Sequence, residues 1–249
     1  MKQQTPDNHA IYEENWEDWN DMKVFGPGSR FLRSIVGDQA DKLKSKPDIK
    51  TVLDVGSGEG TITHLLAEKF PLAQVKGIDF SKKGVDSSNK RYCLKNLSYV
   101  HDESSEALNS KYDLVTCFEV LEHIDDWKSF LKRIADASNK YVLLSTPTGR
   151  MREFEVHVGH FRNFKRKEVE TEMERLGFKT VNALYAGFPF YSPIYRDISN
   201  KRNTGANDFE KGKYTLKQKI VAQLIYISFR YFSTRRNFGD KFCALFEKK

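Results

Sequence analysis

The fold is decided by an apolar run that ends in a glycine-rich turn, and this stretch reads Val52-Leu53-Asp54-Val55-Gly56-Ser57-Gly58-Glu59-Gly60. The apolar run predicts a short strand over residues 51–55. Apolar residues at helical spacing then predict a helix over residues 61–70. Glycine lets the backbone turn tightly and lets backbone N–H groups approach a ligand at the N-terminus of that helix. The stretch therefore predicts a ligand-binding turn between a strand and a helix.

Strands and helices alternate along the chain as far as about residue 186. Further strands are expected over residues 74–79, 97–101, 112–118 and 141–145, a sixth begins at Phe178, and a last one covers residues 238–247. Helices are expected after Asp125, which can cap one of them, and over residues 168–176, where Gly177 ends the helix. This alternation predicts an α/β fold: a Rossmann-like, doubly wound, mostly parallel sheet of seven strands with helices on both faces.

The pattern divides the chain into four regions. Residues 1–50 hold two helical pieces, separated at Gly26-Pro27-Gly28, that are expected to form a helical lid or cap. Residues 51–187 form the core, residues 188–237 an insertion, and residues 238–249 the last strand and the C-terminus. The insertion has an apolar-rich helix within residues 214–232, whose apolar stripe consists of Leu216, Ile220, Leu224, Ile227 and Tyr231. Such a helix is interpreted as a wall of the substrate pocket or as a contact with a membrane surface.

The composition is that of an ordinary globular protein, with 39% hydrophobic and 30% charged residues. The net charge of +7 is spread over several basic stretches, interpreted either as solvated faces or as contacts with an anionic partner. The three cysteines show no paired spacing, the N-terminus lacks an apolar signal core, and no apolar run approaches the roughly 20 residues of a membrane span. We expect a cytoplasmic protein, with peripheral membrane contact as an alternative.

Acidic residues follow the next two predicted strands. Asp79 ends the second strand, where a carboxylate can accept hydrogen bonds from two ribose hydroxyls. Asp102 follows the third strand, where it can accept a hydrogen bond from an adenine amino group. The glycine pattern is G-x-G-x-G, and Thr61 follows it, so the pattern differs from the G-x-G-x-x-G fingerprint of dinucleotide-binding proteins.

These motifs resemble those of class I methyltransferases that depend on S-adenosylmethionine (SAM). The resemblance covers roughly residues 51–186 and rests on Asp54-Val55-Gly56-Ser57-Gly58-Glu59-Gly60, Gly77-Ile78-Asp79, His101-Asp102 and Phe118-Glu119-Val120-Leu121-Glu122-His123. It implies that Asp54, Gly56 and Gly58 lie around the methionine moiety of SAM, with Gly60 and Glu119 as further cofactor-binding residues. It also implies that Asp79 binds the ribose and that Phe80 and Asp102 lie around the adenine. A different cofactor and a catalytically inactive SAM-binding protein are the alternatives.

Two carboxylates and an imidazole come directly after the fourth predicted strand. Glu119, Glu122 and His123 share one side of a turn or short helix at the carboxyl edge of the sheet, where doubly wound folds bind ligands. Such a set can bind a divalent ion such as Mg²⁺ or Zn²⁺. Without a metal, His123 or a later histidine is a candidate general base, with Glu119 beside it.

The Glu-x-x-Glu-His spacing resembles the metal site of small-RNA 3′-terminal 2′-O-methyltransferases and a similar site in ubiquinone-biosynthesis O-methyltransferases. The RNA enzymes have a later histidine, and the stretch around it selects His160 over His157 as the fourth ligand. The same Glu-Val-Leu-Glu-His sequence also occurs in methyltransferases without a metal.

The acceptor of the methyl group is expected to be a hydroxylated small molecule, such as a quinol, a sugar or a natural-product intermediate. The alternative is RNA, which the basic balance and the Glu-x-x-Glu-His spacing favour. No recognisable RNA-binding module is present, however, and the aromatic residues are not interleaved with the basic runs. A non-catalytic SAM-binding regulatory protein is the third possibility.

Overall fold

The computed structural model describes residues 20–44, 49–202, 212–234 and 237–249. Its centre is a seven-stranded sheet with the strand order β3-β2-β1-β4-β5-β7-β6. The strands are β1 (Thr51–Val55), β2 (Gln74–Asp79), β3 (Leu97–His101), β4 (Tyr112–Phe118), β5 (Ser138–Pro147), β6 (Phe178–Ala186) and β7 (Lys241–Lys248). Only β7 runs antiparallel to its two neighbours. The predicted Rossmann-like, mostly parallel sheet is thus confirmed.

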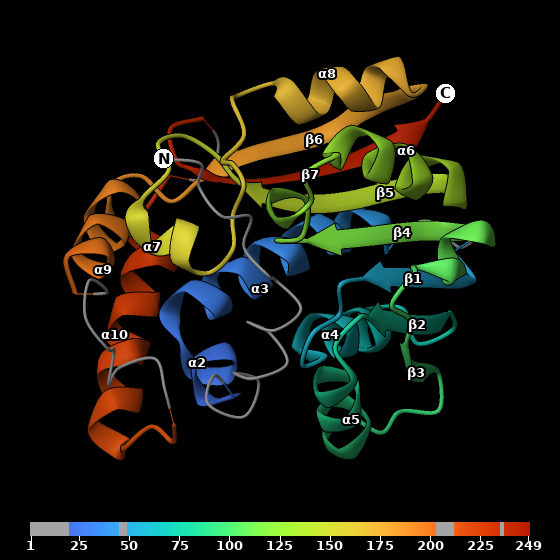
Figure 1. Ribbon diagram of the computed structural model, residues 1–249. Coiled ribbons are helices and arrows are strands. Elements are labelled where there is room, and N and C mark those ends of the chain that lie inside the picture. The colour runs from blue at the N-terminus through green and yellow to red at the C-terminus, as the bar shows by residue number, and fades with distance from the viewer. Residues whose placement is uncertain (1–19, 45–48, 203–211, 235–236) are drawn as a thin grey trace.

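Helices cover both faces of this sheet (Figure 1). They are α2 (Asn20–Phe25), α3 (Pro27–Ala40), α4 (Thr61–Lys69), α5 (Lys82–Arg91), α6 (Trp127–Ala137), α7 (Glu153–His157), α8 (Glu168–Arg175), α9 (Arg196–Arg202) and α10 (Leu216–Phe232). Helices α6 and α8 bury side chains such as Leu131 and Met173 in the core on one face. Helices α3 and α4 bury Ile35 and Leu66 on the other. The two faces therefore have separate hydrophobic cores.

Local signals set the ends of several helices. Pro27 lies in the first turn of α3, where its missing N–H costs no hydrogen bond. The cap of α6 is Asp126, whose carboxylate accepts a hydrogen bond from the Ser129 N–H at 3.2 Å, so the prediction of Asp125 as the cap is wrong by one residue. Ser81 caps α5 in the same way, and the sequence did not reveal this helix because few of its residues are apolar.

The strand order reverses between β1 and β4. The chain runs outward from β1 to β2 and β3, then returns to place β4 on the other side of β1. Loops that follow these strands diverge at this point and leave a crevice at the carboxyl ends of the strands. The glycine-rich turn after β1 and the segment after β4 both line this crevice, and Gly56 packs against Val120.

Helix α10 packs against α3 through one narrow side. Phe229 is fully buried against Phe31, with ring centroids 5.7 Å apart, and Arg230 forms an ion pair with Asp38 at 2.7 Å. The predicted apolar stripe lies elsewhere on the helix. Leu216, Ile220, Leu224 and Tyr231 from this stripe are between 53% and 75% exposed.

No helix within the described residues is long and apolar enough to span a membrane. The cysteines fit the interpretation as unpaired thiols: Cys117 and Cys243 are buried in β4 and β7, and Cys93 is exposed. Of the predicted N-terminal lid, residues 1–50, residues 1–19 and 45–48 lie outside the described residues.

Candidate functional site

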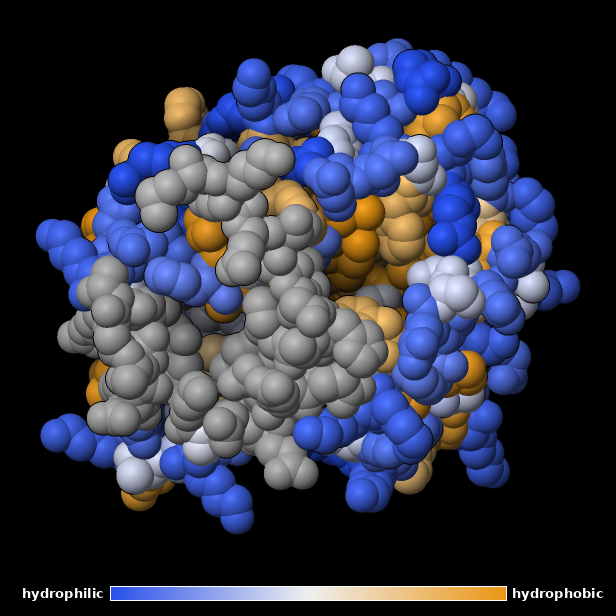
Figure 2. Space-filling model, viewed as in Figure 1, coloured by the Kyte–Doolittle hydropathy of each residue, from blue (hydrophilic) through white to orange (hydrophobic). Residues whose placement is uncertain are grey.

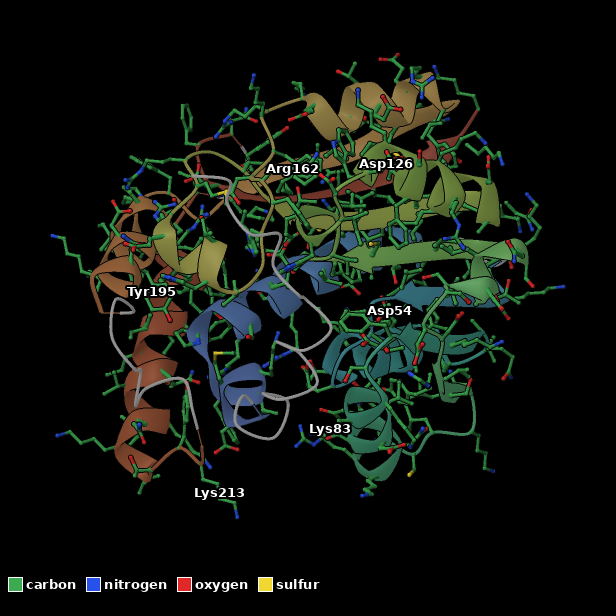
Figure 3. The ribbon with its side chains drawn as sticks, viewed as in Figure 1. Asp54, Lys83, Asp126, Arg162, Tyr195 and Lys213 are labelled. Atoms are coloured by element: carbon green, nitrogen blue, oxygen red, sulfur yellow. The ribbon has the colours of Figure 1, made fainter. Side chains whose placement is uncertain are left out.

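A cavity of about 590 Å³ lies at the carboxyl ends of β1, β2 and β4. A hollow with hydrophobic walls opens in this part of the molecule in Figure 2, and Figure 3 shows Asp54 where β1 ends. Of the predicted cofactor-binding residues, those that line the cavity are Asp54, Gly56, Gly58, Asp79, Phe80, Asp102 and Glu119. Gly60 lies just behind this wall, at the N-terminus of α4. Most of the cofactor-binding residues predicted from the sequence therefore line one cavity.

The glycine-rich turn takes a backbone conformation that other residues rarely adopt. Gly56, Gly58 and Gly60 have φ angles of 75°, 54° and 80°. A Cβ atom on Gly56 would collide with the side chain of Val120, and one on Gly60 would lie 2.6 Å from the hydroxyl of Tyr99. Positive φ and close packing together explain why these positions need glycine.

Two buried aspartates lie beside the turn, and Asp79 is hydrogen-bonded to it. Asp79 accepts hydrogen bonds from the Gly58 and Ser81 N–H groups, both at 2.8 Å. Asp54 accepts from the hydroxyls of Thr63 and Thr116, both at 2.6 Å. Burial raises the pKa of each carboxyl to about 6 and outweighs these hydrogen bonds. Each oxygen of Asp79 keeps a second lone pair, which can accept from a ligand hydroxyl.

At the other end of the cavity, Phe80 and Asp102 lie beyond β2 and β3. The Asp102 carboxylate accepts from the backbone N–H groups of Glu106 and Ala107, at 2.8 and 2.9 Å. These bonds fix the loop after β3. The predicted contact of Asp102 with adenine would use its remaining lone pairs.

Glu119 follows β4 directly and has a φ of 55°, unusual for a residue with a side chain. Its carboxylate accepts a hydrogen bond from the Ser145 hydroxyl at 2.8 Å and pairs with the ammonium of Lys241 from β7. Burial raises the pKa of Glu119, but Lys241 and Ser145 outweigh it and hold the pKa below its ordinary value. Both oxygens are thus engaged by protein groups, and Glu119 is not among the described residues whose ligand atoms come together as a possible metal site.

The other three predicted ligands do come together. One ligand atom from each of Glu122, His123 and His160 lies within 4.8 Å of the others. The two imidazole rings meet edge to face with centroids 4.6 Å apart. Both carboxylate oxygens of Glu122 are fully buried and have no hydrogen-bond partner among the described residues. Burial, reinforced by Glu119, raises the pKa of Glu122.

The two histidines are neutral at ordinary pH. Burial lowers the pKa of His123 to about 3, and it also lowers the pKa of His160. Nδ1 of His123 lies 3.2 Å from the carbonyl oxygen of Gly159, a contact that fits a proton on Nδ1 and leaves the basic lone pair on Nε2. His123 lines the cavity, and His160 stands behind it. His157 is at the end of α7 and is not part of this group.

The cavity has a second wall within residues 1–50, where the sequence predicted a helical lid or cap but no individual lining residue. Lys23 from α2 and Ser29, Leu32 and Arg33 from α3 line it. Helix α10 contributes none of the lining residues of this cavity among those described and packs against α3. Its role as a wall of a substrate pocket stays a prediction. Only the helical spacing of residues 29, 32 and 33 hinted at a shared face.

Comparison with known proteins now decides the family. The family model for the methyltransferase domain matches residues 28–183. The chain is a member of the methyltransferase-domain family. The predicted family is therefore confirmed, and the matched residues include both the glycine-rich turn and the Glu119 to His160 region.

Relatives of this methyltransferase-domain protein differ in substrate. A ubiquinone biosynthesis O-methyltransferase from Neisseria meningitidis serogroup C is 30% identical over 93 residues, which cover 35% of this chain and 39% of that protein. A malonyl-[acyl-carrier protein] O-methyltransferase from Acetivibrio thermocellus is 28% identical over 193 residues, covering 68% and 67%. The matched stretch thus spans about two fifths of the Neisseria protein.

A solved structure with the same fold is the magnesium protoporphyrin IX methyltransferase from Synechocystis PCC 6803 with bound SAM. It is 14% identical, both chains are covered completely, and the TM-score is 0.62. At this identity the likeness concerns the fold alone.

Proposed function

We propose that the protein is a SAM-dependent methyltransferase that methylates an oxygen of a hydroxylated small molecule. The observation that carries this proposal is a single cavity that joins the glycine-rich turn and Asp79 to the neutral imidazole of His123. The names of the relatives support the O-methyl chemistry, and the Synechocystis neighbour, with its bound SAM, supports the cofactor.

The strand order supports one direction for bound SAM. If Asp79 at the end of β2 binds the ribose and Asp102 beyond β3 faces the adenine, the cofactor extends across β1 toward β4. Its methionine half then lies beside the glycine-rich turn and Glu119, and the sulfonium methyl group lies on the side of His123. This direction places the methyl group where an acceptor can approach through the rest of the cavity.

His123 would accept the acceptor's proton through Nε2 as the oxygen attacks the methyl group in line. The low pKa of His123, about 3, makes it a weak base, so the most acidic of the candidate hydroxyls suits it best. A phenolic hydroxyl, with a pKa of about 10, is closer to that base than an aliphatic alcohol, whose pKa resembles the ~16 of water. A phenol or quinol therefore fits the site better than a sugar hydroxyl.

A divalent ion held by Glu122, His123 and His160 would also help to deprotonate the acceptor hydroxyl. The buried carboxylate without a partner and the two neutral imidazoles are a donor set that suits Zn²⁺ and accommodates Mg²⁺ less well. When bound, such an ion would acidify a coordinated hydroxyl. The protein would supply three ligands, and the contact of His123 with Gly159 would orient the imidazole.

RNA is less well supported as the acceptor, because ion pairs engage three of the arginines in the predicted basic stretches. Arg150 and Arg152 both bind Asp197, at 2.7 and 2.6 Å, and Arg162 binds Asp125 at 3.0 Å. These cations would have to exchange partners before they could bind phosphates.

Peripheral membrane contact through α10 is also part of the proposal. The exposed stripe continues through Val221 and Phe232, and α10 contains no acidic residue. An apolar stripe with lysines at its start fits an anionic lipid surface. In a vesicle sedimentation assay with phosphatidylglycerol at low salt, Leu224→Glu should reduce binding. Leu72→Glu, at an exposed leucine on the loop after α4, serves as the control. Equal binding of both variants and the wild type would exclude α10.

The proposed chemistry is tested by His123→Asn, which keeps the size and a hydrogen-bonding group but removes the base. The variant should bind S-adenosylhomocysteine (SAH) as the wild type does, and it should lose most transfer of labelled methyl groups from SAM into an extract of the host cell. Unchanged transfer would contradict the role of His123. Transfer by neither protein, with intact SAM binding, would favour the non-catalytic alternative.

A further inference from the structure

The loop that carries His160 is held by backbone hydrogen bonds on two sides. The N–H of His160 donates to the backbone oxygen of Glu155 in α7 at 3.0 Å, and the N–H of Phe161 donates to the backbone oxygen of Glu122 at 2.9 Å. Helix α7 in turn lies beside α9, which belongs to the insertion (Figure 1). These bonds fix the backbone of His160, but they do not determine which nitrogen of its ring carries the proton.

The carboxylate of Glu155 is a fixed acceptor at the centre of this loop. Its Oε2 accepts from the Arg152 N–H at 2.7 Å and from Nδ2 of Asn163 at 3.0 Å. Its Oε1 pairs with the guanidinium of Arg196, a buried residue of α9 that also pairs with Asp240 at 3.3 Å. Because breaking a buried ion pair leaves an uncompensated charge, this carboxylate cannot turn away from Asn163 without a large cost.

The contacts of Asn163 determine which way its amide group points. Nδ2 donates to Glu155 and also to the backbone oxygen of Arg150 at 3.2 Å. Both partners can only accept a hydrogen bond, so the nitrogen of the amide must face them. Oδ1 is thereby left to face His160, and it lies 3.5 Å from Nδ1 of that ring. An amide oxygen also only accepts, so this contact favours a proton on Nδ1 of His160.

The two histidines of the site then share one arrangement. Nδ1 of His123 faces the carbonyl oxygen of Gly159, and Nδ1 of His160 faces the amide oxygen of Asn163. Each ring carries its proton on Nδ1 and keeps its basic lone pair on Nε2. A general base needs such a lone pair, and so does a metal ligand, whose other ring nitrogen usually donates to an oxygen of the protein.

We propose that Asn163 is a positioning residue that holds His160 in the tautomer with its proton on Nδ1, and that Glu155 and Arg196 orient Asn163 for this role. The use of the Nε2 lone pair, by a proton or by a divalent ion, rests on the proposed function. Through Arg196, the insertion is linked to the site although α10 does not line the cavity.

The tautomer is measured directly by nuclear magnetic resonance on the full chain labelled with ¹⁵N, because long-range ¹⁵N–¹H correlations distinguish a proton on Nδ1 from one on Nε2. The signal of His160 is identified by its loss in His160→Gln. The wild type should show the proton of His160 on Nδ1. Asn163→Leu has a side chain of similar size that cannot accept, and it should shift His160 toward the form with the proton on Nε2.

Asn200→Leu is the matched control. Asn200 of α9 accepts from the Phe154 N–H at 3.2 Å, so this substitution removes a contact of α7 but leaves the amide of Asn163 in place. It should not change the tautomer of His160. Titration with Zn²⁺ gives a second measurement, in which Asn163→Leu should bind about 10- to 100-fold more weakly than Asn200→Leu, the usual effect of removing a group that orients a ligand.

The outcomes separate this proposal from the proposed function. A proton on Nε2 of His160 in the wild type would overturn the role of Asn163 without any variant. An unchanged tautomer in Asn163→Leu would also overturn it, and so would equal effects of Asn163→Leu and Asn200→Leu on the tautomer or on Zn²⁺ affinity. None of these results affects binding of SAH or methyl transfer by the wild type. Failure of the wild type to bind SAH would instead overturn the proposed function.

Discussion

Replacing Gly56 with alanine tests whether the glycine-rich turn shapes the cavity. Gly56 has a φ of 75°, and an added Cβ would collide with Val120 in the segment that carries Glu119 and His123. A left-handed conformation costs a residue with a side chain about 1–2 kcal/mol. Relieving the collision costs about 1–3 kcal/mol more. We therefore expect Gly56→Ala to lower the free energy of unfolding by ~2–5 kcal/mol.

Gly177 provides the matched control, because it has a φ of 88° but nothing within 4 Å of an added Cβ. Gly177→Ala should lower the free energy of unfolding only by the cost of the left-handed conformation, about 1–2 kcal/mol. Urea unfolding gives both values, and titration calorimetry with SAH gives the affinities. Gly56→Ala should bind SAH at least about tenfold more weakly, equivalent to ~1.4 kcal/mol, and Gly177→Ala should bind normally. Equal destabilisation by the two substitutions, with unchanged SAH affinity, would refute the reasoning.

Three further predictions follow from burial and charge. Burial raises the pKa of Asp79 to about 6, so the affinity for SAH should fall as the pH drops below 6 and this carboxyl is protonated. Titration calorimetry should show a weaker pH dependence of SAH affinity for Asp79→Asn than for the wild type. The pKa of Glu122 is raised on folding, so its ionised form destabilises the folded state as the pH rises above the unfolded value of about 4.5. Thermal unfolding should therefore show Glu122→Gln to be more stable than the wild type at pH 8 but not at pH 4. Added Zn²⁺ should stabilise only the wild type. Equal stabilisation of both proteins by Zn²⁺ would count against a metal site. Phe229→Ala should lower the free energy of unfolding by ~3–5 kcal/mol, whereas Leu224→Ala should cost under ~0.5 kcal/mol, and similar values would contradict the packing of α10.

The strands were the most predictable part of the fold. The predicted bounds of β1 to β4 match the structure to the residue. β1 and β4 are largely apolar runs, and β2 and β3 are marked by the acidic residues Asp79 and Asp102 at or just after their ends. Helix α5 was missed because its residues are largely polar and only the Ser81 cap marks it. The apolar periodicity of α10 did not reveal that this stripe is exposed, because periodicity identifies a face but not what covers it.

The site was predictable where its residues follow strands directly. Asp79 and His123 lie at strand ends that the fold brings to one edge, so local sequence was enough. Lys241 and Arg33 could not be found in this way. Lys241 reaches Glu119 from the last strand, and Arg33 enters the cavity because α3 packs over the crevice. Both contacts join residues far apart in sequence that no local motif links.

The most direct test of the proposed function is transfer of labelled methyl groups from SAM into an extract of the host cell, with the products separated into RNA and small-molecule or lipid pools. We predict label in the small-molecule or lipid pool, linked through oxygen, and its loss with Asp79→Asn. Label in the RNA pool, or no transfer by a protein that binds SAM, would contradict the proposal.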